Sequence, residues 1–376
     1  MKKVFISKVA CVSALGTGPD TLWQGLLDGR SGIAPLNRFD CENYLSSQAA
    51  CVAELRTPQG GSLLDHLLEQ LAEQIGDVPR HARLLVASTK GEIDRLENAC
   101  RIGESLPQAV LFRAFLEKIS RRFALTDSGT NINAACASST IALARGAAMI
   151  AAGEAECVLV YAADIISEFV FSGFSALQAL SAEPCRPFDR DRKGLTLGEA
   201  GVVLLLANEE YASRQKHLPL AMISGWGVAN DAHHVTAPAR DGSGLIRACR
   251  SALKSAGISA NQIGAINAHG TGTSYNDAME LTALNELFAD NLPPLHGIKG
   301  SLGHCLGAAG GIEAVVAAYS LQAQKIPGTI GCENPEEAAH GRVSASCQDI
   351  RGDYILSTNS GFGGVNGTLI LQWVQT

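Results

Sequence analysis

The sequence lacks several features that would narrow its function at once. Among its 376 residues only 5% are aromatic, no Lys/Arg-rich run occurs, and the formal net charge is −7. Nucleic-acid-binding proteins usually carry a basic patch with interleaved aromatic residues, so we expect no nucleic-acid partner. No unbroken apolar run reaches the roughly 18 residues that a membrane helix needs, so we expect no membrane span.

Paired cysteines are also missing. The 11 cysteines are scattered and odd in number, and they form no C-x-x-C pair. This pattern is typical of small buried side chains in a reducing compartment, so we expect neither disulfides nor a zinc site. The opening segment, MKKVFISKVACVSALGTG, resembles a secretory signal, but Lys8 interrupts its apolar run. We therefore expect an opening strand and a cytoplasmic protein.

The chain does contain alternating strand-like and helix-like segments. Strand-like runs occupy 83–89, 157–164, 200–208, 220–229, 263–270 and 354–360, and helix candidates occupy 137–152, 244–256, 277–288 and 310–324. Nearly continuous apolar strands bounded by helices indicate an α/β fold whose sheets are covered on both faces. The alternation occurs twice, which predicts two halves, 1–208 with a cysteine after a strand and 218–376 with a histidine after a strand.

One cysteine occupies a junction that favours chemistry. In NINAACASSTIALARGAAMI (131–150), Cys136 follows a strand-like run and precedes a small, apolar helix. Free N–H groups and the helix dipole at such a junction stabilise a thiolate, and a sharp turn would expose the thiol. The alternative is a small buried residue at the start of an alanine-rich helix.

Three further motifs follow in the second half. NAHGTGTSYND (267–277) places His269 at a strand end, where a hydrogen-bonded loop histidine is the alternative. IKGSLGHCLGAAGGIEA (298–314) combines Lys299 and His304 with a glycine-rich helix start, which phosphate sites also resemble. It lacks the spacing of a Walker loop. TNSGFGGVNG (358–367) surrounds Phe362 and alone would pass for a hairpin loop.

In this order the four motifs resemble the β-ketoacyl-acyl carrier protein synthases (KAS I/II-like ketosynthases) of the thiolase superfamily, the condensing enzymes of fatty acid and polyketide synthesis. RPFDRDRKGLTLGEAG (186–201) is similar to that family's R-P-F-D-x-x-R-x-G segment. The resemblance covers essentially the whole chain and is weakest between about 55 and 125. It implies a thiolase-like fold, with duplicated βαβαβ halves in a five-layered αβαβα sandwich that dimerises.

The resemblance also assigns roles to individual residues. Cys136 would accept an acyl group from the phosphopantetheine thiol of acyl carrier protein, after which malonyl-acyl carrier protein loses CO₂ and condenses with it. His269 and His304 would stabilise the enolate that forms. Lys299 and its acidic partner Glu313 would order the histidine site, and Thr271 and Thr273 would hold the pantetheine arm. The backbone N–H groups of Cys136 and Phe362 would form the oxyanion hole, and Phe362 would also gate the acyl tunnel. Asp277 and Glu280 match acidic positions of the family, although a helix N-terminal charge role is equally open for them. Cys305 occupies no catalytic position and is expected to pack. No metal or organic cofactor is implied.

The sequence departs from the family pattern at a few positions. Ala135 precedes the nucleophile where threonine is common, Gly300 follows the lysine in place of serine, and Ser360 stands where phenylalanine is usual. The segment before the nucleophile is compressed. These departures favour a specialised pathway, such as aryl polyene or polyketide chain building.

Three other functions fit the sequence less well. A non-catalytic chain-length-factor subunit is one, but it usually lacks the active cysteine, whereas Cys136, His269 and His304 are all present. A thiolase is disfavoured by the two histidines, and a cysteine hydrolase by the lack of a Cys–His–Asn signature. The expected partners are acyl carrier protein and either a second copy or a chain-length factor.

Overall fold

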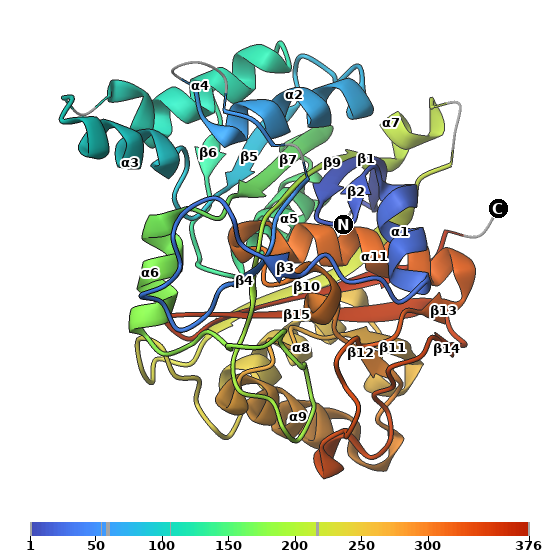
Figure 1. Cartoon of the computed structure of the whole chain (residues 1–376). Helices are drawn as coiled ribbons and strands as arrows, with labels where there is room; N and C mark the ends of the chain where they lie inside the picture. Colours follow the sequence, from blue (N-terminus) through green and yellow to red (C-terminus); the bar gives the residue numbers. More distant parts are fainter. Residues whose placement is uncertain (1, 54, 58–60, 106, 216–217, 375–376) are drawn as a thin grey trace.

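One mixed sheet runs through the whole molecule (Figure 1). The structure is a computed structural model that describes residues 2–53, 55–57, 61–105, 107–215 and 218–374. From one edge to the other, the strands are β12 (Leu295–His296), β11 (Ile263–Asn267), β15 (Tyr354–Gly361), β16 (Val365–Gln372), β10 (Ala221–Asn230), β1 (Val4–Ser13), β9 (Ala200–Asn208), β7 (Cys157–Asp164), β5 (Arg83–Ala87) and β6 (Thr130–Asn131).

The two ends of this sheet have the same topology. In chain order the first half contributes β1, β5, β6, β7 and β9, and the second contributes β10, β11, β12, β15 and β16. If the five strands of each half are numbered in chain order, their spatial order in the sheet is first, fifth, fourth, second, third in both halves. The fifth strand is antiparallel to both of its neighbours, and the pairs beyond the fourth strand are parallel. The duplication predicted from the alternating pattern is therefore confirmed. A short antiparallel pairing of β1 with β10 joins the halves.

Two buried helices fill the space between the halves. Helix α5 (Ser138–Ala152) packs on β5, β7 and β9 of the first half and on β16 of the second, and α11 (Ala309–Ala323) packs on β9, β15 and α5. The helices α2 (Leu63–Ile75) and α4 (Phe112–Arg122) cover the outer face of the first half, and α8 (Ser243–Ala256) and α9 (Ser274–Phe288) cover that of the second (Figure 1). The five predicted layers are confirmed.

Glycine permits the close contact between the two central helices. A Cβ atom at Gly310 would lie 1.9 Å from Thr140 Oγ1 and 2.9 Å from the Thr140 backbone nitrogen. Any larger residue would push α11 away from α5. This contact explains the run of small residues in GAAGG, which sequence alone could equally assign to a phosphate-binding turn.

The apolar composition of α5 has the same origin. By length and composition alone, Ala135–Ala152 would suffice to cross a membrane, with a mean hydropathy of 1.4, but 67% of this stretch is buried inside the protein. A helix packed between two sheet halves has no polar face, so burial in the core accounts for its sequence.

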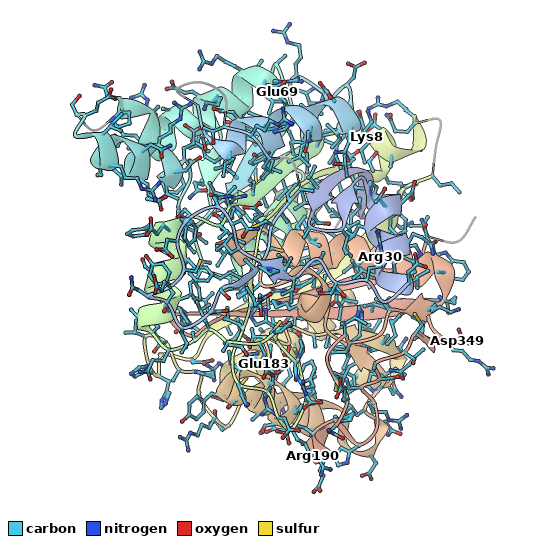
Figure 2. All side chains as sticks on the ribbon, in the orientation of Figure 1. Lys8, Arg30, Glu69, Glu183, Arg190 and Asp349 are labelled. Atoms are coloured by element: carbon cyan, nitrogen blue, oxygen red, sulfur yellow. The ribbon has the colours of Figure 1, made fainter. Side chains whose placement is uncertain are left out.

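The remaining elements are shorter. They are β2 (Gly16–Thr17), α1 (Pro19–Leu27), β3 (Ala34–Pro35), β4 (Gln48–Ala50), α3 (Ile93–Ile102), α6 (Glu168–Ala176), β8 (Leu197–Gly198), α7 (Glu209–Ser213), α10 (Lys299–Leu302), β13 (Lys325–Ile326) and β14 (Gln348–Asp349). The strands β3, β4 and β8 form a small sheet of their own. Two of the shorter elements, β8 and α10, are buried in the interior of the molecule. Charged side chains such as Glu69, Arg190 and Asp349 lie on the outside of the molecule (Figure 2).

The predicted segment boundaries agree closely with the structure, with one exception. The strands 157–164 and 200–208 have the predicted bounds, whereas the strand expected before Cys136 ends at Asn131. The chain then runs irregularly to Ser138. The division into domains at 1–208 and 218–376 stays a prediction, although it agrees with the repeated topology.

Candidate active site

Six of the ten predicted site residues line one cavity of about 340 Å³, and the other four, Lys299, Glu313, Asp277 and Glu280, do not line it. Cys136 lies between β6 and α5, His269 follows β11, and His304 lies between β12 and α11. Because the topology is duplicated, the structural counterpart of the Cys136 segment is the His304 segment, not the His269 segment. The cavity is lined by Cys136, His269, Thr271, Thr273, His304 and Phe362, among others.

The environment of Cys136 differs from the prediction. Only 7% of the residue is exposed, and burial raises the pKa of its thiol to about 11, although the Lys299 charge and a backbone hydrogen bond from Phe362 lower it. The expectation of an exposed, acidic thiol is therefore wrong. The loss of solvation outweighs the stabilisation from nearby N–H groups and charge. In the resting protein the thiol is protonated.

This environment predicts the pH dependence of Cys136 alkylation. A thiol with a pKa of about 11 is a small fraction thiolate at neutral pH. The alkylation rate with iodoacetamide should therefore rise about tenfold per pH unit from pH 7 to pH 9. Mass spectrometry of the Cys136 peptide follows this reaction separately from that of the exposed Cys100. A plateau below pH 8 at Cys136 would show that the thiol is acidic after all.

The GFGG loop closes the cavity over Cys136. The backbone N–H groups of Phe362 and of Cys136 both hydrogen-bond toward the sulfur. A Cβ atom at Gly361 would lie only 3.1 Å from the Cys136 backbone nitrogen, so the loop packs directly on the nucleophile's backbone. The Phe362 ring stacks on Phe174 of α6, with the ring centroids 5.7 Å apart. The side chain of Ser360 bonds Asn366 instead of filling space near the gate.

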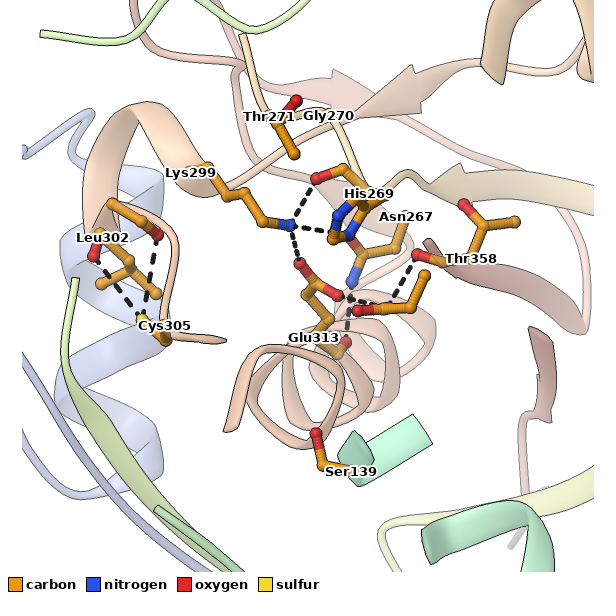
Figure 3. Close-up of polar contacts among 12 residues, drawn as sticks. Ser139, Asn267, His269, Gly270, Thr271, Lys299, Leu302, Cys305, Glu313 and Thr358 are labelled. Atoms are coloured by element: carbon orange, nitrogen blue, oxygen red, sulfur yellow. Dashed lines mark hydrogen bonds and ion pairs between the residues drawn. The ribbon is translucent and has the colours of Figure 1, made fainter. Parts of the chain in front are cut away.

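A buried lysine holds His269. The Lys299 Nζ atom lies 3.2 Å from His269 Nδ1, donates to the His269 carbonyl oxygen, and donates to Glu313 Oε1 at 2.6 Å (Figure 3). Lys299 and Glu313 are each 1% exposed. A buried ion pair tolerates burial far better than either charge alone. The predicted Lys299–Glu313 pairing is therefore present.

Asn359 is a site residue that sequence reasoning missed. Its Nδ2 atom donates to Glu313 Oε2 at 2.6 Å, so it supports the acidic partner of Lys299. The residue stands two positions before Gly361 in the TNSGFGG motif. An asparagine that follows an apolar strand is expected to be buried and to need hydrogen-bond partners. That expectation could have identified Asn359 from the sequence.

Both cavity histidines are neutral. Burial lowers the pKa of His269 and of His304 well below the usual value, and the Lys299 charge lowers both further. Their ring centroids lie 5.3 Å apart at an interplanar angle of 84°. A neutral imidazole keeps one N–H donor and can stabilise a developing negative charge on oxygen, as the predicted role requires.

The acidic residues after the His269 turn, Asp277 and Glu280, accept hydrogen bonds from backbone N–H groups of that turn. Glu280 accepts the N–H groups of His269 and Gly270 at 2.7 and 2.9 Å, and burial raises its pKa to about 7. Asp277 accepts the Thr271 N–H at 2.9 Å and the Phe188 N–H at 2.8 Å, which links the RPFD segment to the turn. Both carboxylates hold the loop, and Asp277 also lies in the first turn of α9, where a negative charge suits the helix N-terminus.

Three other predicted residues have simple environments. The hydroxyl oxygens of Thr271 and Thr273 lie 2.9 Å apart, and both residues line the cavity. The Cys305 Sγ atom turns toward the Leu302 carbonyl oxygen at 3.6 Å, away from the Lys299 ammonium group (Figure 3). Cys305 is buried and does not line the cavity, as expected for a packing residue.

A third buried histidine offers a test of this electrostatic description. Burial lowers the pKa of His296 to about 3, and neither ring nitrogen has a hydrogen-bond partner among the described residues. In the unfolded chain His296 takes up a proton below about pH 6.5, whereas in the folded chain it stays neutral. His296 therefore lowers the unfolding free energy as pH falls below that value. The difference in unfolding free energy between His296→Leu and the native protein should therefore be about 1.4 kcal/mol more favourable to the variant at pH 5.5 than at pH 8. Urea unfolding at both pH values measures this gain, and an equal difference at the two pH values would contradict it.

Sequence and structure comparisons agree with this geometry. A family profile described as beta-ketoacyl synthase, N-terminal domain, matches residues 1–91 and 118–212, and the corresponding C-terminal domain matches 220–333. The chain belongs to the β-ketoacyl synthase family. The gap in the match, 92–117, contains α3 and lies within the stretch where the sequence resemblance is weakest.

Individual relatives of this ketosynthase cover nearly its whole length. The 3-oxoacyl-acyl-carrier-protein synthase 2 of Coxiella burnetii is 29% identical and covers 99% of both chains. The chloroplastic 3-oxoacyl-acyl-carrier-protein synthase II of Arabidopsis thaliana is 30% identical over 98% of this chain and 75% of its own. The solved ishigamide ketosynthase/chain length factor is 27% identical, with a TM-score of 0.91 over 100% of each chain.

Proposed function

We propose that this ketosynthase is a catalytically active β-ketoacyl-acyl carrier protein synthase, an acyltransferase that joins an acyl group to a malonyl unit. The observation that carries the proposal is the convergence of Cys136, His269 and His304 on one cavity. A non-catalytic subunit would have no need of a nucleophile beneath two N–H donors or of two neutral histidines beside it.

In the first stage Cys136 becomes acylated. Its sulfur attacks the thioester carbonyl of an acyl carrier protein, and the pantetheine sulfur leaves and takes up the thiol proton. The backbone N–H groups of Cys136 and Phe362 would stabilise the tetrahedral oxyanion. Phe362 covers this position, so its ring must leave Phe174 for a long acyl chain to enter.

In the second stage the malonyl unit condenses. Its carboxylate leaves as CO₂, and the electron pair passes to the thioester oxygen, where N–H groups of His269 and His304 stabilise the enolate. The enolate carbon attacks the acyl-Cys136 carbonyl, and the Cys136 sulfur leaves and is protonated. Loss of CO₂ supplies the driving force, so the proposed reaction uses no metal or organic cofactor.

The cavity mouth supports carrier-protein binding. Lys193, Thr271 and Thr273 line it, and Arg240 lies over the ring of Tyr275 at 5.4 Å. Threonine hydroxyls suit the amides of a pantetheine arm, and the two cations suit an acidic carrier protein. All 11 cysteines are free, which suits a cytoplasmic location.

We further propose that the chain works as a dimer in a specialised polyene- or polyketide-type pathway. The ishigamide ketosynthase/chain length factor has the same fold over 100% of this chain, and a ketosynthase from Xenorhabdus doucetiae, solved in complex with its chain length factor, is similar too. Ser360 stands where the family resemblance places phenylalanine; it lines the cavity with Phe362 and bonds Asn366, so no second ring fills this position.

Reconstitution tests the proposal. The protein is mixed with acyl carrier proteins of different chain length and saturation and with malonyl carrier protein, with and without a co-expressed chain length factor. We expect a β-ketoacyl carrier protein two carbons longer, with one CO₂ released for each product. No condensation in any combination would overturn the catalytic assignment, and a preference for long saturated primers would overturn the specialised pathway.

A further inference from the structure

His304 is held differently from its neighbour. His269 Nδ1 lies 3.2 Å from Lys299 Nζ, but His304 Nδ1 has no hydrogen-bond partner among the described residues, although the residue is 1% exposed. Its backbone instead bonds on both sides to the segment containing β8. The His304 N–H donates to the Thr196 carbonyl at 2.7 Å, and the Gly198 N–H donates to the His304 carbonyl at 3.0 Å. The position of the His304 ring therefore depends on where β8 lies.

Close backbone packing couples the two segments. A Cβ atom at Gly198 would lie 2.0 Å from the Leu302 carbonyl oxygen, and one at Gly303 would lie 2.6 Å from the Leu197 carbonyl oxygen. No space remains between β8 and the turn before His304. Interiors packed at this density transmit displacements, so a shift of β8 moves His304.

The residue after β8 anchors it. Glu199 is fully buried, and its carboxylate accepts two bonds from Arg38, at 2.6 and 2.7 Å. The same carboxylate accepts the N–H groups of Val52 and Ile166, each at 2.9 Å. Arg38 also donates to the Ile166 carbonyl at 2.7 Å. Bidentate, charge-assisted bonds of this kind fix geometry as well as contribute energy.

We propose that Arg38 and Glu199 are positioning residues for His304, acting through β8 on the second half-reaction of the proposed condensation. Arg38 comes from the loop after β3 and touches no cavity residue among those described. Without its guanidinium group, the buried Glu199 carboxylate loses its counter-charge, and the segment must rearrange to reach water or another donor. A displacement of about 1 Å at a catalytic group can cost as much as ~10²-fold in rate.

The test compares two buried carboxylates whose cations are exposed to a similar degree; Glu92 also keeps Arg95 at 2.8 Å, so Lys118→Met controls for the loss of a partly exposed cation. The Arg38 side chain is 24% exposed and its partner Glu199 is 0% exposed, and the Lys118 side chain is 27% exposed and its partner Glu92 is 1% exposed. Lys118 lies on α4, which covers the outer face of the first half (Figure 1). Arg38→Met should lower malonyl decarboxylation by the acylated protein about tenfold or more, while acylation of Cys136 changes less than twofold. Lys118→Met should spare both half-reactions, and Arg38→Lys should restore part of the lost decarboxylation.

A second readout does not depend on activity. In protein labelled with nitrogen-15 at histidine, the ring signals of His304, assigned with His304→Gln, should shift or broaden in Arg38→Met but not in Lys118→Met. Unchanged His304 signals, or equal loss of both half-reactions, would overturn the positioning role. If the native protein neither acylates nor decarboxylates, the proposed function fails, and the His304 signals alone decide whether Arg38 positions the ring.

Discussion

Malonyl decarboxylation should fall about 10²- to 10⁴-fold when either His269 or His304 is replaced with alanine, while Cys136 can still be acylated. Each ring is buried and neutral, and each lines the cavity with one N–H available to an enolate oxygen. Alanine removes that donor and leaves the developing charge in a site that excludes water. Acylation uses the backbone N–H groups of Cys136 and Phe362 instead, so it should survive.

The two half-reactions can be measured separately. Radiolabelled CO₂ released from malonyl carrier protein reports decarboxylation, and intact mass reports acylation. His296→Leu is a suitable control because His296 is also buried and neutral but does not line the cavity. A decarboxylation rate within threefold of native in both alanine variants would contradict the role assigned to the histidines.

Replacement of Lys299 with methionine should cost about 3–5 kcal/mol of unfolding free energy and abolish condensation. The substitution leaves the Glu313 carboxylate 1% exposed without its cation, and among the described residues only Asn359 still donates to it. It also removes the contact that orients the His269 ring. Stability and activity should therefore fall together in this variant.

A double variant separates the two losses. Replacing both members of a buried ion pair by apolar residues is often neutral for stability. Lys299→Met with Glu313→Leu should therefore recover most of the unfolding free energy in urea titrations, yet remain inactive because His269 stays unsupported. If the double variant is as unstable as Lys299→Met alone, the buried pair is not the source of the lost stability.

Much of the fold could be predicted because its signals are local. The strands 157–164 and 200–208 are buried on both faces, so their sequences are continuously apolar and their bounds are clear. The ordered motifs around Cys136, His269, Lys299 and His304 likewise converge on one site, as the resemblance implied.

The environment of the nucleophile could not be predicted, because distant segments create it. Cys136 precedes an apolar helix, and that junction alone favours an acidic thiol. The GFGG loop, which comes from the second half of the chain, covers the thiol and removes its solvent. The residues around position 136 carry no pattern that would reveal desolvation by a segment so distant in the sequence.

The resemblance implied Lys299 and Glu313 at the histidine site, but the residues that hold Glu313 and the His304 segment were not predicted from the sequence. Asn359 and Arg38 reach the site through contacts with Glu313 and Glu199, and neither pairing has a characteristic spacing. The counterpart of Cys136 became clear only from the matching strand orders of the halves, which place His304 at the equivalent loop. Topology carries this relationship, since the halves share little residue identity.

The most direct test of the central claim is the intact mass of the protein after incubation with acyl carrier protein thioesters. The native protein and Cys305→Ala should each gain one acyl group, because Cys305 faces backbone carbonyls outside the cavity. Cys136→Ala should gain nothing. If Cys136→Ala is acylated as fully as the native protein, or if the native protein is never acylated with or without a partner chain, Cys136 is not the nucleophile of an active condensing enzyme.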